Sequence, residues 1–368
     1  MRIAILGTRG IPANYGGFET FAEELSTRLA ARGHKVTVYC RERYLKPEYR
    51  GVRLVYLPTI HHKYLNTLAH TLVSTLHLLF HRVDAALYCN AANALFTILP
   101  RMAGIPVALN VDGIERKRRK WNAFAKAWYQ MSEYLSTILP NRFVTDAEAI
   151  RQYYKERYNK DSLFIPYGAD TERVATRAAL DRLGLEPYRY FLYVSRMEPE
   201  NRALEVRESF ELADTSMKLA LIGDAPHAQE YIERVRDTKD PRIVMPGGVY
   251  GPGYRELGSW CFAYIHATEV GGTHPALIEA MGRGNLVLYF ETPENSEVCG
   301  DAGLAYHDQA GLTARIAEVL SMSEAEREGL RAKAAARAKE RYDWEAVTTQ
   351  YENLLQGLRR QVNAPASR

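Results

Sequence analysis

Two glycine-rich segments lie between a predicted strand and a predicted helix, where phosphate-binding loops occur. The first spans residues 7–20 (GTRGIPANYGGFET), between an apolar run and a predicted helix, with Gly16 and Gly17 at the helix entrance. Because glycine has no Cβ, such a loop lets backbone N–H groups and the positive end of a helix approach a phosphate. The spacing is neither G-x-G-x-x-G nor G-x-x-x-x-G-K-[ST], which disfavours a nicotinamide site and a P-loop. A plain connecting loop is the alternative interpretation.

The second segment spans residues 268–281 (TEVGGTHPALIEAM) and also leads into a predicted helix. Pro275 suits the first turn of that helix, and Glu279 falls about one turn later. Such a loop offers amides to a diphosphate and a carboxylate to the hydroxyl groups of an attached ribose. The residues expected to contact a ligand here are Gly271, Gly272, Thr273, His274 and Glu279.

An arginine completes the candidate site. Arg196 follows the apolar run 190–195, and the carboxyl ends of strands in an open α/β sheet face the ligand crevice. Its guanidinium can grip phosphate oxygens. A solvated surface arginine is the alternative.

Alternating strands and helices are needed to position these residues. Apolar runs separated by segments of helical spacing predict strands at 2–7, 35–40, 52–57, 85–89, 106–111, 142–145 and 163–166, and again at 190–195, 218–223, 242–245, 261–266, 286–290 and 304–307. This alternation predicts an α/β protein with two doubly wound, mostly parallel sheets in tandem.

Domain limits follow from the same pattern. We expect an N-terminal domain at 1–175, a C-terminal domain at 176–345, and a last helix at 346–368 that packs back toward the N-terminal domain. Ser323 and Glu326 form a predicted capping box, and two final helices should break near Asp343 and Trp344.

Composition excludes several classes of protein. The 368 residues suit two domains, and 48 Lys+Arg against 44 Asp+Glu give a formal charge of +4, which does not suggest an obligate nucleic-acid binder. Four cysteines without a C-x-x-C pair give neither a zinc ribbon nor a disulfide framework, so a reducing cytoplasm is expected. The start MRIAILG does not resemble a signal peptide, and no run reaches the ~18 apolar residues of a membrane span.

Five motifs in order resemble a known family. They are GIPANYGGFE (10–19), VDGIERKRRKW (111–121), IPYGAD (165–170), SRMEPEN (195–201) and EVGGTHPALIEAM (269–281). Together they resemble family 4 retaining glycosyltransferases, most closely the bacterial subgroup with a G-x-P-x-x-Y-G-G-F-E signature, which includes rhamnosyltransferases of cell-wall and capsular polysaccharide assembly. The resemblance covers nearly the whole chain. It implies a GT-B fold, in which two Rossmann-like domains face each other across a cleft and the C-terminal domain, 176–345, binds the nucleotide-sugar.

The resemblance also implies residue roles. Glu279, as the second Glu of an E-x7-E element, would bond the ribose, and Arg196 would bind the diphosphate. Amides around Gly272, Thr273 and His274 would meet the phosphates or the donor sugar. Gly16 and Gly17 would let the N-terminal loop close over the diphosphate.

Two positions depart from the family pattern. Gly271 stands where E-x7-E has its first Glu, and Glu269 lies two residues earlier. Asn201 stands where the wider family often has a lysine, and the adjacent Arg202 is a candidate second cation with a different starting angle. Both departures resemble the pattern of the subgroup, which favours a variant donor site over an inactive protein. Whether Glu269 or Arg202 replaces the missing groups stays open.

The expected reaction breaks an anomeric C–O bond to a diphosphate. Arg196, a helix N-terminus and loop amides can neutralise the leaving group without a metal, and the sequence contains no D-x-D. No metal and no cofactor are expected. For retention we expect front-face substitution, with a diphosphate oxygen accepting the acceptor's proton. Asp112, after the run 106–111, could orient or deprotonate the acceptor; a turn residue before Gly113 is the alternative.

Residues 114–142 combine seven basic and two acidic residues with aromatic ones, which suits an anionic membrane surface or a lipid diphosphate. Residues 61–81 combine five histidines with leucines. A solvated basic face and a core helix are the alternatives for these two segments.

The expected partners are a nucleotide-sugar donor, with dTDP-L-rhamnose preferred by resemblance and UDP- or GDP-hexoses next, and a saccharide or lipid-diphosphate-linked acceptor. We expect no nucleic acid, and a cytoplasmic location that includes the inner face of the membrane. A nucleotide-sugar epimerase and a non-catalytic nucleotide-sugar-binding protein are the alternative functions.

Overall fold

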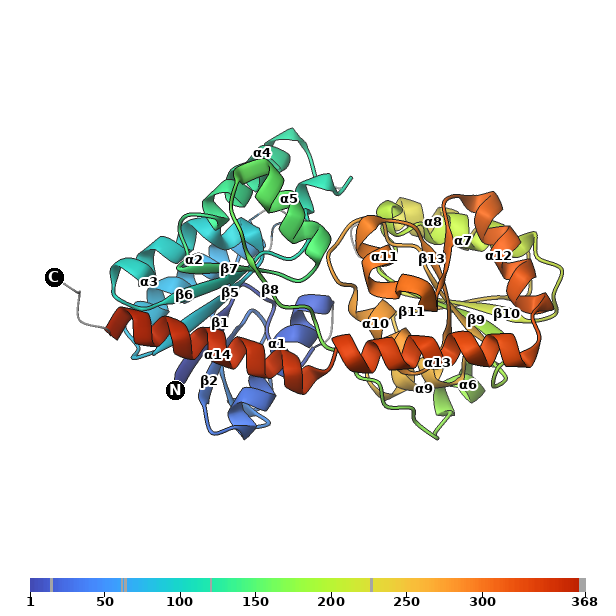
Figure 1. Cartoon of the computed structure of the whole chain (residues 1–368), viewed down its shortest axis with the longest axis horizontal. Coiled ribbons are helices and arrows are strands. Elements are labelled where there is room, and N and C mark those ends of the chain that lie inside the picture. The colour runs from blue at the N-terminus through green and yellow to red at the C-terminus, as the bar shows by residue number, and fades with distance from the viewer. Residues whose placement is uncertain (14–15, 61, 63–64, 120, 226–227, 364–368) are drawn as a thin grey trace. The chain divides into compact units, whose positions relative to one another are not determined.

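The computed structural model describes residues 1–13, 16–60, 62, 65–119, 121–225 and 228–363 (Figure 1). Asn14 and Tyr15 of the N-terminal motif, His61 and Lys120 lie outside the described residues. The chain divides into two compact units. Unit 1 contains residues 1–168 and 344–368, and unit 2 contains residues 169–343.

The sheet of unit 1 has the strand order β3-β4-β2-β1-β5-β6-β7-β8. Its strands are β1 (Arg2–Leu6), β2 (Lys35–Cys40), β3 (Glu48–Tyr49), β4 (Val52–Tyr56), β5 (Ala85–Cys89), β6 (Val107–Asn110), β7 (Arg142–Thr145) and β8 (Leu163–Phe164). All pairs are parallel except β3 with β4. Every predicted strand of this half is present. The strand β3 was not predicted, because a two-residue edge strand has no apolar run.

Helices cover both faces of this sheet. They are α1 (Gly17–Ala31), α2 (Asn66–Leu79), η1 (Ala91–Thr97), α3 (Ile98–Met102), η2 (Glu115–Lys117), α4 (Ala123–Ser136), α5 (Glu148–Tyr158) and α14 (Trp344–Asn363). Because crossovers between parallel strands are right-handed, α1 lies on one face, and α2, α3, α4 and α5 lie on the other. α14 packs along α1 and the strands β5 and β6 (Figure 1).

The central strands of unit 1 are buried on both faces, as parallel sheets require. Every residue of β5 and β6 is buried, and all are apolar except Asn110. Asn110 donates through Nδ2 to the hydroxyl of Tyr351 in α14 (2.8 Å). One side of α14 is buried, and it includes Tyr351, Leu355 and Leu358. The final helix is therefore part of the core of unit 1.

The sheet of unit 2 is entirely parallel, with the order β11-β10-β9-β12-β13-β14. Its strands are β9 (Tyr190–Val194), β10 (Lys218–Ile222), β11 (Ile243–Gly247), β12 (Ala263–His266), β13 (Leu286–Phe290) and β14 (Leu304–Tyr306). Its helices are α6 (Ala178–Leu183), η3 (Pro199–Asn201), α7 (Ala203–Glu211), α8 (Gln229–Arg236), α9 (Pro252–Trp260), α10 (Pro275–Gly282), α11 (Pro293–Cys299), η4 (Gly300–Ala302), α12 (Gln309–Ser321) and α13 (Glu324–Arg341). All six strands predicted for this half are present.

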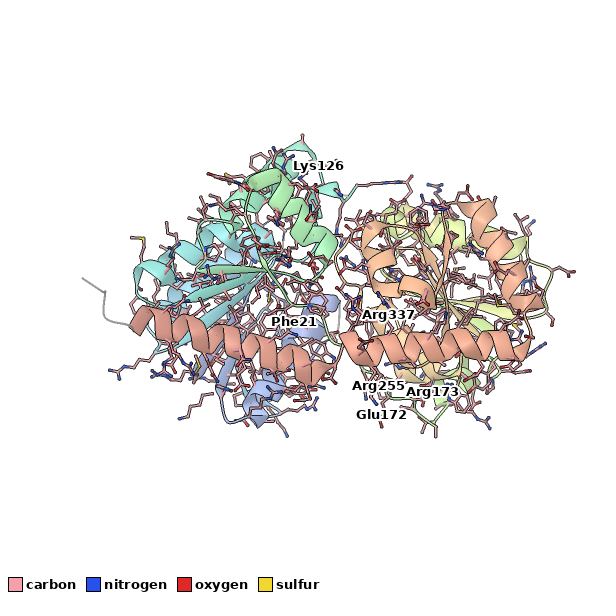
Figure 2. All side chains as sticks on the ribbon, in the orientation of Figure 1. Phe21, Lys126, Glu172, Arg173, Arg255 and Arg337 are labelled. Atoms are coloured by element: carbon pink, nitrogen blue, oxygen red, sulfur yellow. The ribbon has the colours of Figure 1, made fainter. Side chains whose placement is uncertain are left out.

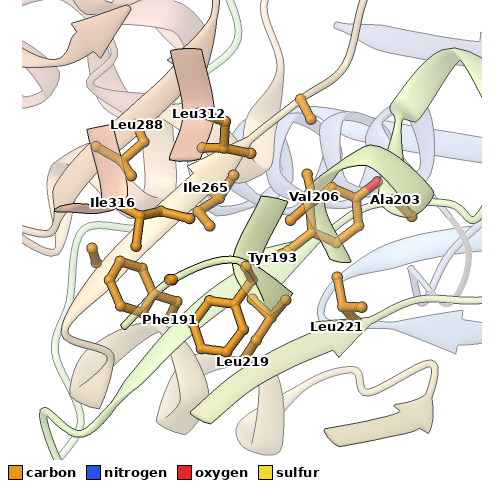
Figure 3. Close-up of a cluster of buried hydrophobic side chains, with 14 of the residues drawn as sticks. Phe191, Tyr193, Ala203, Val206, Leu219, Leu221, Ile265, Leu288, Leu312 and Ile316 are labelled. Carbon is orange, nitrogen blue, oxygen red and sulfur yellow. The ribbon is translucent and has the colours of Figure 1, made fainter. Parts of the chain in front are cut away.

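One core of unit 2 lies between its central strands and the helices α7 and α12. Phe191 and Tyr193 of β9 pack with Val206 of α7 and with Leu312 and Ile316 of α12 (Figure 3). The capping box at the start of α13 is confirmed, since Glu326 N–H donates to Ser323 Oγ (3.3 Å) and Ser323 N–H to Glu326 Oε2 (2.8 Å).

The division between the units corrects the expected limits. Unit 1 stops at Gly168 rather than at 175, because the next residues bond to α9: Val174 N–H donates to Ser259 Oγ (3.0 Å) and Trp260 Nε1 donates to Thr176 O (3.1 Å). Trp344, expected in the second domain, begins α14 and packs on Phe21 with ring centroids 6.5 Å apart.

Among the described residues, no helix has the length and hydrophobicity that a bilayer span requires.

Candidate functional site

The carboxyl ends of β9 and β12 form the switch point of the unit 2 sheet. The chain runs from β9 outward to β10 and β11, and from β12 outward to β13 and β14 on the other side. Ligands of open α/β sheets bind where the strand order reverses in this way. The segments that follow the two strands meet there, because Ser195 Oγ and Thr268 Oγ1 are 3.4 Å apart.

Arg196 lies at this switch point and is partly accessible, with its side chain 30% exposed. Its Nη2 is 3.9 Å from Glu198 Oε2, and its carbonyl accepts from Asn201 Nδ2 (2.7 Å). Asn201 is 2% exposed, and its carbonyl accepts from the Tyr193 hydroxyl (2.7 Å). The residue in the place of the family lysine therefore fixes the backbone that carries Arg196.

Arg202 and Glu269, the two candidates for the missing family groups, pair with each other. Arg202 Nε donates to Glu269 Oε1 (2.5 Å), and the guanidinium lies over the Phe290 ring, 4.0 Å from its centroid. A ligand phosphate near Arg202 would share this cation with a carboxylate. The pair has no local signal in the sequence, because its members are 67 positions apart.

Glu279 is buried on α10 within a cluster of ionisable groups. Its Oε2 accepts from the Tyr254 hydroxyl (2.6 Å) and lies 3.5 Å from Arg283 Nη1. Burial raises the pKa of Glu279, and the nearby Arg283 opposes that rise. Arg283 also lies 3.7 Å from Asp170 Oδ2. The i,i+4 spacing from Glu279 to Arg283 was readable in the sequence, whereas the contact with Tyr254 carried no local signal.

A carboxylate offers about four lone-pair positions, and the Tyr254 hydroxyl supplies one hydrogen bond to Glu279. The arrangement around Glu279 therefore suits a further hydroxyl donor such as a ribose. Arg283 keeps the carboxylate beside a positive charge while burial disfavours its ionised form.

The imidazole of His274 occupies the space that a side chain at position 271 would need. A Cβ built on Gly271 would overlap the His274 ring. His274 precedes α10, and its ring centroid is 4.8 Å from that of His266. Burial lowers the pKa of His266 to about 3, so this neighbour is uncharged near neutral pH. Gly271 and His274 thus form one feature of the loop, next to the buried Gly272 and Thr273.

The loop of unit 1 between β1 and α1 is fixed by carboxylates of its own helix. Arg9 N–H donates to Glu19 Oε1 (3.0 Å) and Ala13 N–H to Glu23 Oε2 (2.6 Å). Gly16 caps α1 in an extended conformation, and Gly17 is the first residue of the helix. Two amides of this loop are therefore committed to Glu19 and Glu23, which the sequence analysis did not anticipate.

Asp112 follows β6 in a left-handed backbone conformation, with φ of 60°. Its N–H donates to Asn110 Oδ1 (2.9 Å), and the buried Tyr167 hydroxyl donates to Asp112 Oδ1 (3.4 Å). Non-glycine residues in this conformation are uncommon and cluster at functional sites. Asp112 is held at the carboxyl end of the unit 1 sheet rather than in a solvated turn.

Residues 15–173 match the family model described as Glycosyltransferase Family 4. The match covers less than half of the 368 residues and agrees with the predicted glycosyltransferase. It ends before Arg196 and Glu279.

Solved structures similar to this chain have the predicted GT-B fold. The sucrose-phosphate synthase of Thermosynechococcus elongatus has a TM-score of 0.82 at 17% identity, covering 97% of this chain and 98% of that one. Anabaena HepE, in complex with UDP and glucose, has a TM-score of 0.80 at 15% identity, covering 97% and 100%. WaaG, a glycosyltransferase involved in lipopolysaccharide biosynthesis, has a TM-score of 0.75 at 15% identity with the same coverage. No curated protein matches the sequence significantly.

Proposed function

We propose that the protein transfers a sugar from a nucleotide-sugar to a saccharide or lipid-linked saccharide, with retention of configuration. The observation that carries this proposal is the arrangement at the switch point of unit 2. A partly exposed arginine follows β9, and a glycine-rich helix entrance with a buried glutamate follows β12. A nucleoside diphosphate has the phosphates and ribose hydroxyls that these groups suit.

Each group has one role in this proposal. Arg196 and the amides of Gly272, Thr273 and His274 bind the diphosphate, and Glu279 accepts from the ribose. Negative charge develops on the diphosphate as its bond to the sugar breaks. The positive charge of Arg196 and the N-terminus of α10 therefore stabilise the leaving group more as the reaction proceeds. Arg202, which is paired with Glu269, is the second cation of the donor site. Gly271 leaves the space that the His274 imidazole occupies.

The reaction needs no metal in this proposal, because the fixed positive groups perform the neutralisation. A diphosphate oxygen accepts the proton of the acceptor hydroxyl, and the new bond forms on the face from which the diphosphate leaves. Asp112 orients the acceptor, and the loop at Gly16 and Gly17 completes the diphosphate contacts.

The favoured donor is dTDP-L-rhamnose, and the process is bacterial cell-surface polysaccharide synthesis in the cytoplasm or at the inner face of the membrane. This choice rests on the N-terminal signature. The HepE structures named with UDP and UDP-glucose support a nucleotide-sugar as the donor class.

Ligand-induced thermal stabilisation tests the proposal. Full-length protein is melted with dTDP-, UDP- and GDP-sugars, and the stabilising donors are then assayed for slow hydrolysis and for transfer. One donor should raise the melting temperature and release free sugar. Isomerised nucleotide-sugar as the product would establish an epimerase instead, and tight binding with no turnover a non-catalytic protein.

A further inference from the structure

Helix α2 of unit 1 buries its polar residues. His70, Thr71, Ser74 and Thr75 are 0% exposed, and Leu78 is the one large apolar residue of the helix that is fully buried. Thr75 Oγ1 lies 2.8 Å from the hydroxyl of the buried Tyr88 of β5. The inner side of α2 therefore packs on the sheet largely through polar groups.

The outer side of α2 is apolar. Leu72 and Val73 are each 39% exposed, Leu76 is 45% exposed, and Phe80 just after the helix is 87% exposed. Residues 66–79 contain no Asp, Glu, Lys or Arg. A surface helix of a soluble domain normally shows the opposite pattern, with its apolar stripe inward.

Helix α4 is inverted in part. Its buried side includes Ala125 and Tyr129 together with Ser132 and Glu133, and Glu133 Oε2 accepts from the Tyr153 (2.8 Å) and Tyr158 (3.0 Å) hydroxyls. Its outer side shows Phe124 and Met131, 81% and 43% exposed. With Tyr134 and Ile138, 52% and 40% exposed, these residues recur at helical spacing.

The apolar outer sides of α2 and α4 are joined through η1 and α3. α2 contacts both of these elements, and α4 contacts η1. The side chain of Arg101 in α3 donates to the carbonyls of Ile138 (3.1 Å) and Leu139 (2.8 Å), just beyond α4. Between them Met102 is 79% exposed. We call this set of exposed apolar side chains the α2–α4 face; it consists of Leu72, Val73, Leu76, Phe80, Met102, Phe124, Met131, Tyr134 and Ile138.

The charge around this face is positive. Lys117 and Lys126 are exposed beside it, and Figure 2 shows Lys126 on α4. The two acidic residues of 114–142 are turned toward arginines: Glu115 pairs with Arg118 (2.6 Å) and Glu133 with Arg116 (2.9 Å). A symmetric contact between two copies of the chain would bring like charges together, whereas anionic lipid headgroups complement them.

We propose that the α2–α4 face rests on the surface of an anionic lipid bilayer, with its apolar side chains at the boundary between headgroups and acyl chains. Apolar area and basic residues act together in such binding, and neither alone gives stable association. The face belongs wholly to unit 1, and the proposed diphosphate and ribose contacts of Arg196 and Glu279 lie in unit 2. Lipid binding can therefore be tested independently of the proposed transfer reaction.

Vesicle flotation with the full chain tests this proposal. The vesicles contain phosphatidylcholine alone or with about one third phosphatidylglycerol. Wild-type protein should float with the anionic vesicles. The variants Leu72→Gln/Leu76→Gln and Phe124→Gln/Met131→Gln should each lower the partition coefficient about tenfold or more, since each removes exposed apolar area. Lys126→Gln should weaken binding only to the anionic vesicles.

Leu212→Gln is the matched control, because Leu212 is a 69% exposed leucine of unit 2 and its replacement should leave flotation unchanged. Melting curves establish that each variant is folded. The proposal is overturned if wild-type protein does not float, or if the α2 and α4 variants float like wild type. It is equally overturned if light scattering shows a dimer that Leu72→Gln/Leu76→Gln dissociates.

Discussion

Arg196 is the residue on which binding of the leaving group depends most directly. Replacing it with alanine removes charge-assisted hydrogen bonds to the diphosphate, each worth about 1.5–3 kcal/mol. We expect Arg196→Ala to weaken nucleoside diphosphate binding about tenfold to a hundredfold in a calorimetric titration.

Arg189 provides the control for this measurement. It lies just before β9, at the opposite end of the strand that leads to Arg196, and its Nη2 donates to Ser216 Oγ (3.0 Å). Arg189→Ala should bind the nucleotide like wild type. Equal weakening by both variants would show a general charge effect and contradict the assignment of Arg196.

Gly271 gives a sharper test of the donor loop. Gly271→Ala requires the His274 ring to move, because a Cβ at 271 would overlap it. We expect Gly271→Ala and His274→Ala each to weaken donor binding about tenfold, and the double variant to be no worse than either, since both act on the same contact. Wild-type affinity in Gly271→Ala would refute a role for the position of the His274 imidazole in donor binding.

At this scale, the sequence predicts which residues lie at the carboxyl ends of strands, because strand ends follow from local apolar runs. Arg196 and Asp112 lie at such strand ends, and Glu279 lies on the helix α10 that follows β12. It does not predict which partners they meet. Arg202 with Glu269, and Glu279 with Tyr254, are contacts between segments brought together only by the fold.

Among the elements, α13 offers a direct test of helix energetics. Gly329 is exposed within this helix, and a Cβ there meets no atom within 4 Å. Gly329→Ala should therefore stabilise the protein by about 0.5–1 kcal/mol and raise its melting temperature by about 1–3 °C.

Gly168 is the contrasting position, because a Cβ there would overlap the Trp344 ring of α14. Gly168→Ala should lower the melting temperature, at a cost of about 1–3 kcal/mol from overpacking. A rise in melting temperature for this variant would contradict the packing of α14 described above.

The strands follow from the sequence because buried parallel strands are short continuous apolar runs. The orientation of α2 and α4 does not follow in the same way. An apolar stripe at helical spacing normally indicates the inward side of a helix, and only the structure shows that Leu72, Leu76 and Phe124 point outward.

Taken as a whole, the molecule contains a buried histidine in each unit. Burial lowers the pKa of His70 to about 4 and that of His266 to about 3, against about 6.5 in an unfolded chain. At a pH between the folded and the unfolded pKa values, each of these histidines is protonated in the unfolded chain and neutral in the folded protein. Stability should therefore fall as the pH drops below about 6.5, by up to about 1.4 kcal/mol per pH unit for each histidine.

The melting temperature measured from about pH 8 down to about pH 5 checks this expectation. His266→Gln should reduce the slope, and His307→Gln, with a side chain 77% exposed, should not. The pKa values of Glu345 and Glu352 are lowered by hydrogen bonds from Arg32 and His34 respectively, so these carboxylates lose their contribution only below about pH 4.5 and leave this window to the histidines. A flat profile would contradict the prediction.

The return of α14 to unit 1 has a consequence for biosynthesis. Residues 344–363 complete a core that began with residues 1–168, and all of unit 2 is translated between these two parts. When unit 2 emerges from the ribosome, the nascent first unit still lacks Tyr351 and Leu355, and the side of Phe21 that the Tyr351 ring covers is open. The second unit can thus finish folding before the first, reversing the usual order of domains during synthesis.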